Sequence, residues 1–149
     1  MTCPVASGAR DERGQALIEM ALTMPLLLLL SVGVFEFGRA FEYWQVMTNA
    51  AREGARIAVL PGQSRDDVVA RVRAYLDGGR IAAAASATVE VAQNAEIATG
   101  GGGTMSASTV TIAYPFQFIA LQGIARLVAG ASTAGDAFTM TASATMRNE

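Results

Sequence analysis

The stretch that decides the fold runs from Gly14 to Leu60 and reads GQALIEMALTMPLLLLLSVGVFEFGRAFEYWQVMTNAAREGARIAVL. A glycine is followed by four residues, a lone glutamate, a long apolar run, an aromatic cluster and a series of small residues. No turn signal strong enough to end a helix occurs before Pro61. The pattern predicts one long helix, on which the rest of the chain forms a small head.

The middle of this helix has the composition of a membrane span. No charged residue occurs between Met20 and Phe35. Together with Gln15–Glu19 the run has roughly 20 residues and, at about 1.5 Å per residue, covers about 30 Å, the hydrocarbon thickness of a bilayer. Residues 15–35 are therefore predicted to cross a membrane, and residues 36–60 to continue the helix outside it.

Pro25 lies inside the predicted span. It is expected to kink the helix, because a proline removes one helical hydrogen bond, and membrane helices tolerate this. A cleaved signal peptide is the alternative interpretation of the apolar run, but it requires small residues around a cleavage site at its far end. The bulky and charged sequence Val34-Phe35-Glu36-Phe37 stands there instead, so a span is favoured.

Aromatic residues directly follow the apolar run. Amphipathic rings favour the headgroup layer of a membrane, so the cluster predicts an interfacial belt. The alternative is that part of this helix face is buried on the head, and the two arrangements are compatible on different turns. The predicted belt consists of Phe35, Phe37, Phe41, Tyr43 and Trp44.

One stripe of the helix beyond the span is predicted to be a packing face. Its members recur at spacings of three and four and become small after Trp44, and small residues let another backbone approach closely. The stripe consists of Phe37, Phe41, Trp44, Thr48, Ala51, Ala55 and Ala58. Charged residues on other faces predict i,i+3 pairs, each worth about 0.2–0.5 kcal/mol: within Glu36, Arg39 and Glu42, and within Arg52, Glu53 and Arg56.

Residues 61–149 are predicted to form an α+β head. Ser64 and Asp67 approximate a capping box that begins a helix through about Leu76. Alternating apolar and polar residues predict three strands, and hairpin-like connections favour a small antiparallel sheet packed on the long helix. The strands are expected at 86–93, 105–114 and 136–147, with 94–104 as a flexible connector and 116–129 as a short helix or irregular cover on the sheet.

The composition excludes several function classes. The chain has 149 residues and a net charge of −2, without the clustered basic face that nucleic-acid binding requires. Histidine is absent, which removes the commonest metal ligand and general base. The single cysteine, Cys3, has no electropositive surroundings, and the glycine run Gly100–Gly103 lacks the Lys-Ser/Thr of a phosphate loop. We therefore expect no catalytic residue, no cofactor and no metal, and a protein that is not an enzyme.

The start of the quoted stretch, Gly14-Gln15-Ala16-Leu17-Ile18-Glu19 before an apolar helix with Pro25, resembles the type IV prepilin signature. Later segments are similar to the TadE-like minor pilins (pseudopilins) of the tight-adherence pilus, namely Glu36–Arg39 with Asn49–Arg56, and Thr139–Arg147. The motif resemblance covers Gly14 to about Val59 and the end of the chain, and the middle of the chain matches only in its pattern of elements.

The resemblance implies that residues 1–14 are a leader, which a membrane peptidase removes after Gly14 to free the amine of Gln15. A glycine gives a peptidase access to the backbone, because it has no side chain. In an assembled fibre, Glu19 would pair with this amine on a neighbouring subunit, since an ionised carboxylate in a membrane is costly unless it is paired. Met20 departs from the tyrosine or phenylalanine of related major pilins.

We therefore expect a minor pilin that assembles or primes a bacterial tight-adherence (type IV-like) pilus. The implied partners are other pilins, bound through the apolar helix, a prepilin peptidase and the assembly platform of the inner membrane. Arg10 and Arg13 favour a cytoplasmic N-terminus, and the resemblance implies a head outside the inner membrane. A pseudopilin of a related secretion system and an uncleaved membrane-anchored binding module are the alternatives.

Overall fold

The computed structural model describes residues 8–98, 102–129 and 136–148. The chain divides into two compact units. The N-terminal unit comprises Met1–Phe37 and Phe118–Asp136, and the sheet unit comprises Gly38–Gln117 and Ala137–Glu149. Cys3, the first half of the predicted leader and Gly100–Gly101 lie outside the described residues.

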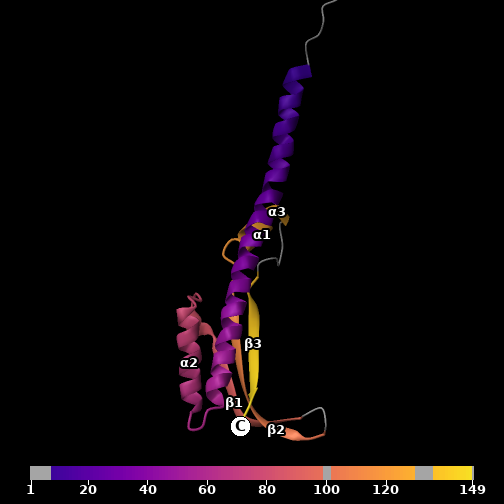
Figure 1. Cartoon of the computed structure of the whole chain (residues 1–149). Helices are drawn as coiled ribbons and strands as arrows, with labels where there is room; N and C mark the ends of the chain where they lie inside the picture. The colour runs from indigo at the N-terminus through magenta and orange to yellow at the C-terminus, as the bar shows by residue number, and fades with distance from the viewer. Residues whose placement is uncertain (1–7, 99–101, 130–135, 149) are drawn as a thin grey trace, which may run out of the picture. The chain divides into compact units, whose positions relative to one another are not determined.

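Helix α1 extends from Gly8 to Ala58 and has 51 residues (Figure 1). The prediction of one long helix is therefore confirmed, and the helix passes through Pro25 without interruption. It ends just before Pro61, where Gly62 adopts a φ of 80° that favours glycine. The predicted kink at Pro25 stays a prediction.

The segment after the second strand contains a helix, α3, from Leu121 to Ala129. This agrees with the expectation of a short helix between residues 116 and 129. The expected packing on the sheet is wrong, because Phe118–Asp136 groups with the first part of α1 in the N-terminal unit. The apolar composition of this segment alone did not indicate whether it packs on the sheet or on the long helix.

Three antiparallel strands form one sheet in the order β1-β2-β3 (Figure 1). They are β1 (Thr88–Ala98), β2 (Thr104–Phe116) and β3 (Phe138–Arg147). The predicted α+β fold, a long apolar helix followed by a small antiparallel sheet, is therefore confirmed. The alternation read from the sequence also holds in the last strand, where Met140 and Ala142 are buried and Thr141 and Ser143 are exposed.

Strand β1 is longer than predicted and continues past Gln93 to Ala98. The register shifts between Ala92 and Ala95, and Asn94 within this irregularity has a φ of 55°. Asparagine tolerates this left-handed conformation better than most residues. Asn94 therefore marks a β-bulge inside the strand and does not begin a connector.

Strand β2 also runs further than predicted, to Phe116. The predicted strand ended at Tyr114, directly before Pro115, because a proline disfavours a strand, but Pro115 is paired with Thr139 of β3. The pairing of β1 with β2 reaches only Ala113. Beyond that point β2 has one free edge, where a proline without an N–H group is tolerated.

The buried face of α1 lies one residue away from the predicted stripe in its first half. Phe37, Phe41 and Trp44 are exposed. The residues directly before them, Glu36, Ala40 and Tyr43, are buried. The prediction was correct further along, where Ala51, Ala55 and Ala58 are in the core. The buried positions of α1 are Glu36, Ala40, Tyr43, Met47, Ala50, Ala51, Gly54, Ala55 and Ala58.

Helix α2 extends from Arg65 to Gly78 and lies beside the C-terminal part of α1 (Figure 1). The predicted capping box is present, since the backbone amide of Asp67 donates to Ser64 Oγ at 3.2 Å and the amide of Ser64 donates to Asp67 Oδ2 at 3.0 Å. The buried face of α2 consists of Val68, Val72 and Leu76. The helix therefore completes the core of the sheet unit.

The opposite face of the sheet is polar. The hydroxyl oxygens of Thr109 and Thr145 lie 2.8 Å apart, and those of Thr111 and Ser143 lie 3.1 Å apart, each pair joining β2 to β3. Cross-strand hydroxyl pairs stabilise a sheet modestly. This face needs no apolar cover, so α1 and α2 with the sheet form a two-layer head.

Candidate functional site

The residues predicted for processing lie near the beginning of α1. Gly14 and Gln15 are exposed, and a β-carbon added to Gly14 would meet nothing within 4 Å. Glycine in a helix interior is about 1 kcal/mol less favourable than alanine. The peptide bond after Gly14 is therefore accessible, and it lies where the helix is easier to open than at its neighbours.

Glu19 is also exposed on α1. Within the part of the chain that the structure describes, its carboxylate makes no hydrogen bond and no ion pair. Its neighbours Ile18 and Met20 are apolar and are 65% and 56% exposed. The structure thus presents one carboxylate on an apolar surface, available to a partner outside the chain.

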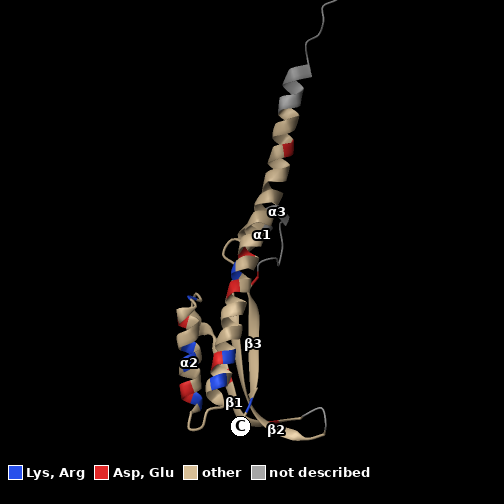
Figure 2. Ribbon diagram, viewed as in Figure 1, with Lys and Arg blue, Asp and Glu red and all other residues tan. Residues whose placement is uncertain are grey.

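The part of α1 that follows is a candidate membrane span. An 18-residue window of the helix has a mean hydropathy of 2.1, and none of that window is buried in the protein. Figure 2 shows a long uncharged section of α1 between an isolated acidic residue and the charged residues nearer the head. Exposed apolar surface costs about 25 cal/mol per Å² in water. A bilayer or the apolar helices of other subunits would remove this cost.

Four of the five predicted belt residues are exposed. The exposed fractions are 67% for Phe35, 64% for Phe37, 59% for Phe41 and 43% for Trp44. The rings of Phe41 and Trp44 also contact each other, with centroids 6.0 Å apart. These four side chains are available to a headgroup layer, and that role stays a prediction.

Tyr43 is different, because it is only 8% exposed. Its ring packs edge-on against Tyr114 at a centroid distance of 5.8 Å, and its hydroxyl accepts a hydrogen bond from the Ala82 amide at 3.1 Å. The hydroxyl of Tyr114 donates to the carbonyl of Ala82, and burial raises the pKa of Tyr114. Tyr43 therefore belongs to the core of the head, which is the alternative considered for this helix face.

Glu36 is fully buried, although the sequence placed it among surface charge pairs. Its Oε1 accepts hydrogen bonds from the backbone amides of Ile119 and Ala120, both at 2.8 Å. These amides precede the first turn of α3, where N–H groups lack helical partners and a negative charge is favourable. Glu36 therefore attaches the start of α3 to α1. No spacing rule connects residues so far apart in sequence, so sequence reasoning missed this contact.

Arg39 has a comparable role inside the sheet unit. Its Nη2 donates to the carbonyl of Gln117 at 2.6 Å, and its guanidinium carbon lies 4.6 Å from the centroid of the Phe116 ring. A guanidinium over an aromatic face is stabilised by the ring quadrupole. Arg39 therefore fixes the end of β2 on α1.

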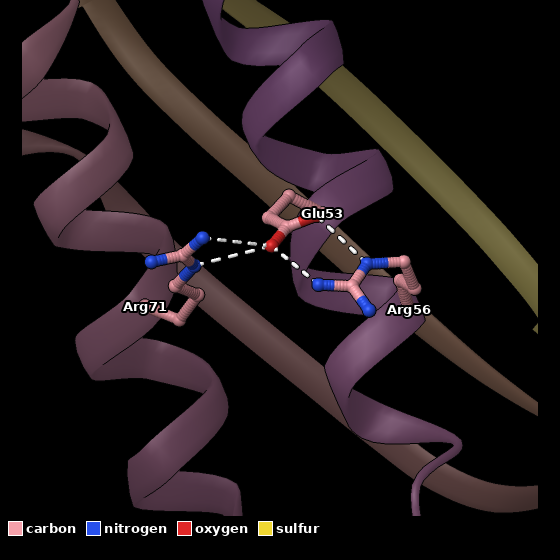
Figure 3. A network of polar contacts seen from close by, with 3 residues as sticks. All are labelled: Glu53, Arg56 and Arg71. Atoms are coloured by element: carbon pink, nitrogen blue, oxygen red, sulfur yellow. Dashed lines mark hydrogen bonds and ion pairs between the residues drawn. The ribbon is translucent and has the colours of Figure 1, made fainter.

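Glu53 joins α1 to α2 (Figure 3). Its carboxylate accepts from Arg56 Nη2 at 2.8 Å and from Arg71 Nη2 at 3.0 Å. The hydrogen bond from Arg56 and then that from Arg71 lower the pKa of Glu53 from 4.5 to about 2. The predicted pair of Glu53 with Arg56 is confirmed, and Arg71 is a third member that only the fold brings near.

A polar network missed by the sequence reasoning lies at the end of the chain. The hydroxyl of the buried Ser108 lies 2.9 Å from Asn148 Oδ1 and 3.4 Å from the carbonyl oxygen of Ala58. The side-chain amide of Asn148 donates to Asn94 Oδ1 at 2.7 Å and to Ser106 Oγ at 2.9 Å. The network ties the bulge of β1 and the chain end to the last turn of α1.

These contacts are structural in character. Among the described residues, no group of three or more His, Cys, Asp or Glu side chains is placed to hold a metal ion. The exposed features that could contact a partner are Gly14 and Glu19 near the start of α1 and the apolar surface that follows them.

Comparison with known proteins points to the same part of the chain. The family model described as TadE-like protein matches residues 14–56. No curated protein and no solved structure matches the chain. The matched segment begins at the glycine of the predicted cleavage site and covers nearly all of α1 beyond it, so the resemblance to TadE-like proteins is confirmed for this segment. The match supports a pilin-like protein associated with the tight-adherence pilus.

Proposed function

We propose that this chain, whose residues 14–56 match the TadE-like family, is a minor pilin that helps to assemble or prime a bacterial tight-adherence pilus. The observation that carries the proposal is the coincidence of three features on one helix. The family match begins at Gly14, an exposed glutamate follows at Glu19, and an exposed apolar surface of membrane-spanning length comes next.

The first step in this proposal is removal of the leader, residues 1–14. The prepilin peptidase of the inner membrane cleaves the exposed peptide bond between Gly14 and Gln15, and Gln15 then carries a free amine. Glu19 follows four residues later, about 6 Å along the helix at about 1.5 Å per residue. The new positive charge and the carboxylate then lie at the same end of the apolar segment.

The second step is entry into the fibre. An ionised carboxylate in a membrane helix is costly unless it is paired, by about 2.5–3.5 kcal/mol at the centre of the helix on the insertion scale and by less near the end of the span, where Glu19 lies. Pairing of Glu19 with the Gln15 amine of a neighbouring subunit removes this cost only when the two helices are in register. The apolar surface of α1 then moves from lipid to protein contacts, with Pro25 as a point where the helix bends.

The remaining parts of the chain have supporting roles in this proposal. The span anchors the protein in the inner membrane before assembly, with the head outside, and the assembly platform extracts it. The head completes its own core and holds α1 in place. The protein acts as a structural component and not as an enzyme.

Incorporation into fibres tests the assembly step. Cells that express Glu19→Ala are compared with cells that express Glu42→Ala, which removes an exposed acidic side chain from the same helix beyond the apolar run. We expect Glu19→Ala to be processed but to be missing from sheared fibres, and Glu42→Ala to behave as wild type. Normal incorporation of processed Glu19→Ala would contradict the pairing step.

A further inference from the structure

We propose that residues 118–126, the interfacial segment, lie in the headgroup layer of the same bilayer that α1 crosses. The inference rests on the proposed membrane anchoring of α1. It assigns a second membrane contact to a segment that lies between β2 and β3 in sequence and that carries no recognisable motif.

The contacts of Glu36 place this segment beside the end of the apolar span of α1. Glu36 is the first charged residue after the uncharged run from Met20 to Phe35. Its carboxylate accepts the amides of Ile119 and Ala120 at 2.8 Å each. The start of α3 therefore lies within hydrogen-bond distance of the residue at which the apolar span ends, and the headgroup region begins at this level.

An aromatic contact holds the same two parts of the chain together. The rings of Phe37 and Phe118 pack edge to face, with centroids 6.1 Å apart and an interplanar angle of 70°. Gln122 Nε2 donates to Asp136 Oδ1 at 2.5 Å, which joins the beginning of α3 to the point where the chain returns to the sheet. The first half of the segment is thus held by α1 and by Asp136.

The side chains of the segment have the distribution of an interfacial helix. Ile119 is 75% exposed, more than Leu22, which at 70% is the most exposed large apolar residue of the span. Leu121 is buried, and Arg126 in the last turn is exposed. An outward-facing apolar residue, followed in the same segment by an exposed cation, suits the boundary between acyl chains and phosphates.

The charge of Glu36 is consistent with this position. An ionised carboxylate near hydrocarbon is costly unless it is hydrogen-bonded, and the first amides of a helix are costly there when they lack acceptors. The contact between Glu36 and the amides before α3 satisfies both groups at once. The bilayer is therefore the occupant that we assign to the exposed side of the segment, in continuity with the exposed surface of α1.

Depth-dependent fluorescence quenching tests the inference on the full chain in liposomes. Cys3→Ser removes the only native cysteine, and single cysteines are then introduced by Ile119→Cys, Leu28→Cys or Thr141→Cys and labelled with an environment-sensitive fluorophore. Leu28 reports the span, and Thr141 reports the polar face of the sheet. The lipids carry bromine either near the headgroups or deep in the acyl chains, and iodide probes access from water.

We expect the label at position 119 to lose most fluorescence with shallow bromine, the label at 28 with deep bromine, and the label at 141 only with iodide. Quenching at 119 by iodide alone would overturn the inference, as would protection from both quenchers, which would indicate a protein partner. Equal lipid quenching at 119 and 141 would also overturn it, because the contact would not be specific. Failure of deep quenching at 28 would instead contradict the anchoring on which the proposed function depends.

Discussion

Gly54 of α1 faces Val72 of α2 so closely that a β-carbon on Gly54 would lie 2.5 Å from Cγ2 of Val72. The same β-carbon would lie 3.3 Å from Cγ1 of Val110 in β2. One glycine therefore sets the distance at which the long helix, the short helix and the sheet meet. At this position, a small residue of α1 allows close packing within the head.

Gly54→Ala is predicted to destabilise the head by about 1–3 kcal/mol, the usual cost of overpacking a core. The control is Gly38→Ala, because a β-carbon at Gly38 meets nothing within 4 Å. That control is expected to raise stability by about 0.5–1 kcal/mol, since alanine favours the helix. Chemical unfolding of the full chain in detergent, followed by near-UV circular dichroism, measures both. Equal stability of the two variants would contradict the close packing.

The ion pairs of Glu53 with Arg56 and Arg71 predict that the stability of the head depends on pH. The folded pKa of Glu53, about 2, lies below the ordinary value of 4.5. Its contribution is therefore complete above the unfolded pKa and is lost as the pH falls from about 5 towards 2. The effect is small, because both arginine side chains are 55% exposed.

Unfolding midpoints at pH 7 and pH 3 measure this contribution. Glu53→Gln is expected to be less stable than wild type at pH 7, and the difference is expected to shrink at pH 3. Glu42→Gln, which changes an exposed acidic residue of the same helix, is the control and is expected to show no such change. A difference between Glu53→Gln and wild type that grows towards acid would refute the assignment.

Removal of the Glu36 carboxylate is predicted to release the start of α3. Glu36→Ala leaves the amides of Ile119 and Ala120 without their acceptor, so hydrogen exchange at these two amides is expected to become faster. Exchange at the buried strand residues Val110 and Ile112 should change little, because they belong to the sheet unit. Exchange measured by mass spectrometry on the full chain would disprove this role if residues 119 and 120 kept their wild-type protection.

Asn148→Ala is predicted to destabilise the head by about 0.5–1.5 kcal/mol, because it removes hydrogen bonds of the network. The buried hydroxyl of Ser108 loses its nearer partner, and the exposed side chain of Asn94 loses its bond to Asn148. Asn49→Ala, an exposed asparagine on α1, is the matched control and is expected to be nearly neutral. The same detergent unfolding experiment checks this, and a neutral Asn148→Ala would mean that the network adds nothing to stability.

Local patterns predicted the elements of this fold well. Alternation located the strands, and the serine and aspartate of the capping box located the start of α2. The sequence also identified the exposed apolar helix, because its length and lack of charge need no tertiary information. These features depend on neighbours within one or two turns of the chain.

Features that depend on contacts between distant residues were missed or misplaced. The predicted packing stripe of α1 was displaced by one residue near Tyr43, because spacings of three and four alone do not determine which side of an aromatic-rich helix faces the head. The burial of Glu36 depends on amides of Ile119 and Ala120, which lie 83 and 84 residues later. The side chain of Asn94 in the bulge accepts a hydrogen bond from Asn148, which lies 54 residues later in the sequence, and local patterns cannot predict this contact.

Cleavage after Gly14 is the central claim, and the N-terminus of the mature protein tests it most directly. The full chain is produced in cells with and without an active prepilin peptidase, and the N-terminal residue is determined by mass spectrometry, with Gly14→Leu as the uncleavable variant. We predict Gln15 as the first residue only when the peptidase is present, and an intact leader in Gly14→Leu. An intact wild-type N-terminus in the presence of the peptidase, or cleavage near Phe35, would contradict the account.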